Sequence, residues 1–139
     1  MFTVSREINF CYGHRLLEYA GKCRHLHGHN GRAIISFDAS GLDSHGMVLD
    51  FSEIKEVVGR WIEENLDHRM ILDRTDAAAV TLQEMGEPVY LMDANPTAEN
   101  IAKRIFEVAA ENGFPVVEVK LWETPHCCAT YRPKTISRP

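Results

Sequence analysis

Apolar and polar residues alternate along the first ten positions of the chain. The apolar members of this pattern are Phe2, Val4, Ile8 and Phe10. A period of two predicts a strand with one buried face. If the register continues without a bulge near Gly13, Tyr12 and His14 share that buried face.

The same alternation returns between residues 27 and 37. The residues that share one parity there are His27, His29, Gly31, Ala33, Ile35 and Phe37. This pattern predicts a second strand, with two histidines at its start and an apolar face behind them. Residues 16–22 lack the alternation and predict a loop, with a turn at Gly21.

Two later stretches have apolar residues at helical spacing. The first follows Asp50, a typical N-cap residue, and ends near Asn65. The second follows Thr97 and is terminated by Gly113 and Pro115. Between them, residues 76–85 predict a short helix and residues 88–92 a short edge strand. The helices are therefore separated by a small insertion.

Two strands are expected after the second helix. Val119 and Leu121 share their parity with Glu123, and residues 127–131 form the last predicted strand. The order is two strands, two helices with an insertion, and two strands. This order predicts an α+β fold instead of a βαβ repeat. We expect one domain over residues 1–139.

Charge and composition exclude several classes of protein. The chain of 139 residues has a net charge of −5, and its lysines and arginines are scattered singly, so no nucleic-acid surface is expected. Charged residues in the first twenty positions argue against a signal peptide or a membrane-spanning helix. We therefore expect a cytoplasmic protein without a membrane partner. The four cysteines include the adjacent pair Cys127 and Cys128, and are expected to be thiols.

The candidate chemistry is concentrated between Cys23 and His29. On an extended backbone His27 and His29 project from the same face, and His14 supplies a third imidazole. Three ligands leave a zinc ion with an open position, as in catalytic sites, whereas Cys23 as a fourth ligand would close the site, as in a structural module. Spacing leaves both arrangements possible. We favour the open site, because a thiolate beside a cation is a usable base or nucleophile.

Five short motifs, taken in order, resemble those of the 6-pyruvoyltetrahydropterin synthase and 6-carboxytetrahydropterin synthase family. They are Phe10-x-x-x-His14-Arg15-Leu16, Cys23-x-x-x-His27-Gly28-His29-Asn30, Leu66-Asp67-His68, Pro96-Thr97-Ala98-Glu99-Asn100 and Glu123-Thr124. The resemblance implies the tunnelling fold, in which a four-stranded antiparallel sheet carries two helices on one face. It also implies barrel-like trimers that stack into a hexamer, with active sites between subunits.

Roles for individual residues follow from the same resemblance. It implies that His14, His27 and His29 bind zinc and that Cys23 is the catalytic base. It further implies that Asp67 and His68 form a relay with the cysteine of a neighbouring subunit, and that Glu123 anchors a pterin. Without the resemblance, the Asp67–His68 pair would be interpreted as a solvated pair at a helix end. Glu123 would be interpreted as a misread strand register as often as an anchor.

The resemblance implies a zinc-dependent lyase acting on 7,8-dihydroneopterin triphosphate. One outcome is 6-carboxytetrahydropterin with release of acetaldehyde and triphosphate, on the route to queuosine and related 7-deazaguanine nucleosides. The alternative is 6-pyruvoyltetrahydropterin with loss of triphosphate only. We favour the carboxy product, because the Asp-Ala-Asn-Pro-Thr-Ala-Glu-Asn segment is similar to bacterial members with that activity. A non-catalytic zinc module is the alternative from another class.

The remaining polar residues receive structural interpretations. Glu99 is expected to complement the helix dipole. The other cysteines, Cys11, Cys127 and Cys128, are expected to be small core or near-surface thiols. The other histidines are expected to be solvated loop residues, namely His25, His45 and His126. Two positions depart from the family pattern, where Tyr12 replaces a small residue and Gly31 an aromatic one. We predict that the Tyr12 ring fills the space that Gly31 leaves.

Overall fold

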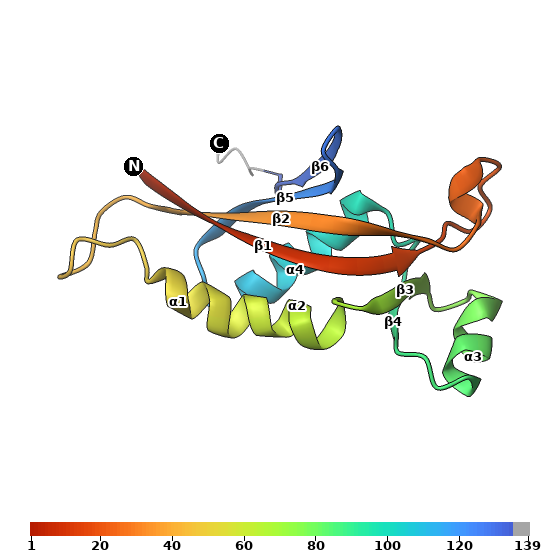
Figure 1. Cartoon of the computed structure of the whole chain (residues 1–139). Helices are drawn as coiled ribbons and strands as arrows, with labels where there is room; N and C mark the ends of the chain where they lie inside the picture. The colour runs from red at the N-terminus through yellow and green to blue at the C-terminus, as the bar shows by residue number, and fades with distance from the viewer. Residues whose placement is uncertain (135–139) are drawn as a thin grey trace.

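The structure, a computed structural model, describes residues 1–134. A curled six-stranded sheet is covered on one face by helices (Figure 1). The strands follow the spatial order β4-β3-β1-β2-β5-β6. The chain therefore has the α+β architecture that the sequence predicts.

The two longest strands form the centre of the sheet. β1 (Phe2–His14) and β2 (His27–Ala39) are antiparallel, and every residue is paired in one uninterrupted register. Tyr12 and His14 are each 3% exposed, so both lie on the buried face. The alternation in the sequence was sufficient to place them, because no bulge occurs near Gly13.

The two strands predicted after the second long helix are present and form an antiparallel hairpin. β5 (Val116–Thr124) pairs with β2, and β6 (Cys127–Tyr131) pairs with β5, both antiparallel. Val119 and Leu121 are fully buried. The register shifts between Trp122 and Thr124, so Glu123 lies in an irregularity next to the turn.

The sheet has six strands, two more than the four-stranded sheet that the family resemblance implies. One of the two is the short edge strand predicted at residues 88–92. β3 (Arg69–Asp73) runs parallel to β1 and pairs with it only at residues 12–14, and β4 (Val89–Met92) runs parallel to β3 at the edge. The strands β1, β2, β5 and β6 pair antiparallel with one another in that order, from the middle of the sheet to its other edge. The strand that the sequence pattern did not predict is β3, which forms from the apolar run at residues 70–72 because it is held between β1 and β4.

The helices begin and end close to the predicted residues. Asp50 caps α1 (Phe51–Ile54), which continues through the π-helical turn η2 (Lys55–Gly59) into α2 (Arg60–Asn65). Thr97 accepts a hydrogen bond from the Asn100 nitrogen and caps α4 (Ala98–Glu111). The insertion contains α3 (Ala77–Glu84), capped by Asp76. A single turn of 3-10 helix, η1 (Lys22–Arg24), lies in the loop between β1 and β2.

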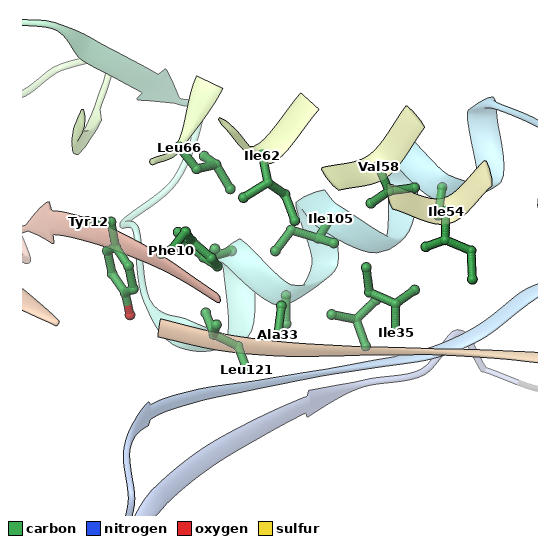
Figure 2. Packing of buried hydrophobic residues seen from close by; sticks show 14 of the residues in the cluster. Phe10, Tyr12, Ala33, Ile35, Ile54, Val58, Ile62, Leu66, Ile105 and Leu121 are labelled. Carbon is green, nitrogen blue, oxygen red and sulfur yellow. The ribbon is translucent and has the colours of Figure 1, made fainter. Parts of the chain in front are cut away.

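The core lies between the helices and the buried face of the sheet. Figure 2 shows Ile54, Val58 and Ile62 pointing from the helix toward the strands, where Ile35 and Ala33 meet them. The Tyr12 ring stands at one end of this cluster. The hydrophobic core therefore continues directly into the region of the three histidines. None of the helices in residues 1–134 is long and apolar enough to cross a membrane.

Candidate metal centre and active site

Three histidines converge at the end of the two central strands. His14 comes from the last position of β1, and His27 and His29 come from the start of β2. One ring nitrogen of each lies within 4.8 Å of the others. The ring centroid of His14 is 4.5 Å from that of His27 and 5.1 Å from that of His29. The arrangement suits a small cation bound by imidazoles.

Two hydrogen bonds to the main chain orient these rings. His14 Nδ1 donates to the oxygen of Pro96 at 2.7 Å, and His27 Nδ1 donates to the oxygen of His25 at 2.7 Å. In both residues the other nitrogen, Nε2, is buried and has no hydrogen-bond partner among residues 1–134. Metal-binding histidines show this pattern, in which a second contact fixes the tautomer and leaves one lone pair for the ion. The residues therefore fit a metal.

The environment of His14 favours its neutral form. Burial is the main cause that holds the pKa of His14 below its ordinary value, and His27 and His29 act in the same direction. The contact with Pro96 and the Glu123 charge oppose this effect. A neutral imidazole is the form that binds a metal ion.

Glu123 lies beside this cluster. Its Oε1 atom is 3.8 Å from His14 Nε2 and accepts a hydrogen bond from the Tyr12 hydroxyl at 3.3 Å. Burial, followed by the Glu123 charge, raises the pKa of Tyr12 far above its ordinary value. The Tyr12 hydroxyl therefore keeps its proton and donates to the carboxylate. Sequence reasoning missed this contact, which spans 111 positions.

The predicted steric exchange between Tyr12 and Gly31 is confirmed. A Cβ atom on Gly31 would lie 2.8 Å from Tyr12 Cε1 and 3.2 Å from Tyr12 Cδ1. The Tyr12 ring therefore occupies the space that a side chain at position 31 would need.

Cys23 shares a small cavity with part of the histidine cluster. The cavity has a volume of about 180 Å³, and its lining includes His14, Cys23 and Glu123 together with Glu99 at the start of α4. The Cys23 oxygen accepts from the Leu16 nitrogen at 2.9 Å, which fixes the loop against the end of β1. Glu99, for which the sequence predicts only a role at the helix dipole, therefore lies close to the candidate site.

The loop before α4 fastens the segment that follows His14. The Asn95 side chain donates to the oxygen of Leu17 at 3.0 Å and accepts from its nitrogen at 2.9 Å. Arg15 forms two hydrogen bonds with Asp76, the buried cap of α3, one of them from Nε at 2.7 Å. Neither contact was predicted, because each joins residues that are distant in the sequence.

Asp67 and His68 lie on a different side of the cluster from Cys23. Asp67 accepts a hydrogen bond from the Cys11 nitrogen at 2.9 Å, and its Oδ2 lies 2.9 Å from His68 Nδ1. His68 is 80% exposed, and its φ of 56° is in the left-handed region. It lines a cavity of about 740 Å³ together with His27 and His29, whereas Cys23 lines the smaller cavity. Within a single chain, His68 and Cys23 therefore do not share a cavity.

The cysteines and histidines that were given no catalytic or metal-binding role are exposed. His25, His45 and His126 are all exposed, as are Cys11, Cys127 and Cys128. Cys127 and Cys128 nevertheless line the cavity that contains Cys23.

Comparisons with known proteins find relatives over nearly the whole chain. Residues 3–134 match the family model described as 6-pyruvoyl tetrahydropterin synthase. The chain is 41% identical over 134 residues to the 6-carboxy-5,6,7,8-tetrahydropterin synthase of Rickettsia conorii, covering 91% of this chain and 97% of that protein. It is 31% identical over 140 residues to the protein of the same name from Haemophilus influenzae, covering 95% and 99%.

Solved structures resemble this one over a similar length. An uncharacterised protein from Wolinella succinogenes has a TM-score of 0.83 at 27% identity, covering 96% of this chain and 98% of that chain. The Caenorhabditis elegans 6-pyruvoyl tetrahydropterin synthase has a TM-score of 0.72 at 24% identity, covering 96% of each chain. The second similarity is evidence for the fold alone.

Proposed function

The chain belongs to the 6-pyruvoyl tetrahydropterin synthase family, and we propose that it is a zinc-dependent 6-carboxy-5,6,7,8-tetrahydropterin synthase. In the proposed reaction 7,8-dihydroneopterin triphosphate and one water give 6-carboxytetrahydropterin, acetaldehyde and triphosphate. The two bacterial relatives that carry the name of this product, at 41% and 31% identity, support this choice within the family. The product would enter the route to queuosine.

The observation that carries the proposal is the cluster of three histidines with two buried, unpartnered Nε2 atoms. His14, His27 and His29 would hold the metal through ring nitrogens. A bound zinc ion polarises substrate oxygens and so acidifies the C–H bonds beside them. Three protein ligands leave a coordination position for the substrate, as a catalytic site requires.

Cys23 and Glu123 would act on the substrate from the small cavity. The Cys23 thiolate would remove a proton from the substrate side chain, for which it needs access to the cavity that it lines with His14. Glu123 would accept hydrogen bonds from the N–H edge of the pterin through its carboxylate. Asp67 would orient His68, which returns or accepts protons, in the manner of a catalytic triad.

We further propose that the active form is an oligomer of this chain, with a hexamer of two trimers as the expected form. Cys23 and His68 line different cavities, so a relay between them needs His68 of a second copy. Exposed His68 is available for such a contact, since 80% of its side chain surface is accessible in the single chain.

Product analysis tests the proposed reaction. Purified protein loaded with zinc is incubated with 7,8-dihydroneopterin triphosphate, and acetaldehyde and the pterin product are measured. Acetaldehyde in equal amount to 6-carboxytetrahydropterin is the expected result. Triphosphate release with a 6-pyruvoyl product and no acetaldehyde would assign the alternative reaction. Absence of both products from a zinc-loaded oligomer would contradict both assignments.

Subunit complementation tests the shared site. The variants Cys23→Ala and His68→Ala should each be inactive, whereas mixed oligomers made by co-expression should regain about one quarter of the wild-type activity, because a quarter of the sites combine an intact Cys23 with an intact His68. A co-expressed double variant, Cys23→Ala/His68→Ala with wild type, provides the matched control for expression. Mixed oligomers without any activity would show that both residues must come from one chain.

A further inference from the structure

One oxygen of Glu123 faces two different groups. Oε1 is 3.3 Å from the Tyr12 hydroxyl and 3.8 Å from His14 Nε2, the buried nitrogen that has no hydrogen-bond partner among residues 1–134. The carboxylate is therefore directly beside the position at which the three histidines could hold a metal. Among residues 1–134, only the three imidazoles form a cluster with the geometry of a metal site, and Glu123 is not part of it.

At this position Glu123 could itself become a metal ligand. Carboxylate oxygens are good zinc ligands, and a fourth protein ligand closes a tetrahedral site. If Glu123 moved onto the ion, the open position would be lost. The carboxylate would also become unavailable to a ligand in the cavity. Some group must therefore hold Glu123 near the histidines and off the metal.

The Tyr12 hydroxyl is suited to this task because its ring has little freedom to move. The ring is 3% exposed and lies in the space above Gly31, where a Cβ atom would be only 2.8 Å from Cε1. Its centroid is 5.3 Å from that of His14 and 5.7 Å from that of His29. A hydroxyl on a ring held in this way can restrain a more mobile carboxylate.

On the basis of the function proposed above, we propose that Tyr12 is a positioning residue for Glu123. Its hydroxyl keeps Oε1 beside the three-histidine cluster without letting it become a fourth metal ligand, and leaves Oε2 for the N–H groups of a pterin. Tyr12 acts only through Glu123 and does not contact the reacting atoms. Gly31 is part of the same device, because only a residue without a side chain leaves room for the ring.

The variant Tyr12→Phe removes the hydroxyl and keeps the ring. Cobalt(II) replaces zinc as a spectroscopic probe, because its visible absorption depends on the number and kind of its ligands. We expect the cobalt spectrum of Tyr12→Phe to change as the Glu123 carboxylate joins the ion, and the spectrum of Tyr12→Phe/Glu123→Gln to return toward that of Glu123→Gln alone. The matched control Tyr131→Phe, the same change on a ring that packs on Phe106, should leave the spectrum as in the wild type. An unchanged spectrum in Tyr12→Phe would overturn the proposal.

Ligand binding gives a second measurement that does not depend on turnover. Fluorescence titration of the metal-free protein with neopterin should show about tenfold weaker binding in Tyr12→Phe, the size expected when a hydrogen bond to a charged group is lost. In the Glu123→Gln background, Tyr12→Phe should have no further effect on binding. An additional loss there would mean that Tyr12 acts independently of Glu123, and would refute its role as a positioning residue.

The two measurements separate this proposal from the proposed reaction. If the wild-type protein turns over no pterin triphosphate, the reaction is wrong, but a changed cobalt spectrum in Tyr12→Phe still supports the restraint on Glu123. If the wild type is active and Tyr12→Phe matches it in cobalt spectrum and neopterin affinity, the reaction stands and the role of Tyr12 is refuted.

Discussion

His14 donates a hydrogen bond from Nδ1 to the main-chain oxygen of Pro96, 82 positions later in the sequence, at a distance of 2.7 Å. Pro96 directly precedes Thr97, the cap of α4. The start of this helix and the orientation of a candidate metal ligand are therefore set by one short loop. Since the acceptor is a main-chain oxygen, the contact depends on the conformation of the loop and not on a side chain at position 96.

Metal binding should depend on His27 and not on His25. His27→Ala removes a ring whose Nε2 is buried and has no hydrogen-bond partner among residues 1–134. We expect the affinity for zinc to fall by at least about 100-fold, because loss of a ligand should cost more than loss of a residue that only hydrogen-bonds to a ligand. His25→Ala is the matched control, because His27 uses only the main-chain oxygen of His25. Zinc per chain, measured by atomic absorption after dialysis, distinguishes the two variants. Equal zinc contents would contradict the three-histidine site.

The variant Cys23→Ala tests whether the thiol is a base or a fourth ligand. A base should be dispensable for metal binding, so we expect full zinc content with kcat reduced by about 10²- to 10⁴-fold. The control Cys128→Ala removes an exposed thiol from the same cavity, and should keep both the zinc content and the kcat of the wild type. Loss of zinc or of folding in Cys23→Ala would instead indicate a closed structural site.

The local pattern of the sequence was enough to predict the strands that hold the candidate ligands. Alternation placed His14 on the buried face, and the parity of residues 27–37 placed His27 and His29 beside it, because a side-chain period of two is a property of the strand itself. Capping by Asp50 and Thr97 was also predictable, since the side-chain oxygen that caps the helix and the backbone N–H that donates to it are close together in the chain.

Contacts between distant residues could not be derived in this way. The apolar run at residues 70–72 is too short to identify a strand, and it becomes one only between β1 and β4. The contact of Tyr12 with Glu123 and that of Arg15 with Asp76 depend on the complete fold. The roles of Cys23, Asp67 and His68 came from the family resemblance, and remain predictions.

The backbone at His68 should favour glycine. With φ at 56° a residue with a side chain is strained, and we expect His68→Gly to be more stable to unfolding than His68→Ala by about 1 kcal/mol. Both variants should be inactive if His68 is part of the relay. Glu18 has a φ of 54°, so Glu18→Gly and Glu18→Ala should show the same difference in stability with full activity. Urea denaturation measures the stabilities. A His68→Ala variant at least as stable as His68→Gly would mean that the backbone relaxes without cost.

The buried carboxylate of Asp76 should contribute to the stability of the folded protein. Its side chain is fully buried, caps α3 and receives two hydrogen bonds from Arg15. Asp76→Ala removes the cap and leaves Arg15 without its carboxylate, and we expect it to lower the free energy of unfolding by about 2–3 kcal/mol. The exposed pair of Arg74 and Asp93 is the control, and Asp93→Ala should change stability little.

The pH dependence follows from the direction of the shift. The hydrogen bond from Arg15 is the main cause that holds the pKa of Asp76 below its ordinary value of 3.8, so the ionised carboxylate is favoured in the folded state. The Asp76 carboxylate makes its full contribution to stability at pH values above this ordinary pKa. The contribution is lost as the pH falls through the lower pKa that the group has in the folded protein. The difference in stability between wild type and Asp76→Asn should therefore be constant from neutral pH down to about pH 5 and shrink below pH 4. Urea denaturation at a series of pH values measures this difference. A difference that stays constant down to pH 2 would show that the charge of Asp76 does not contribute.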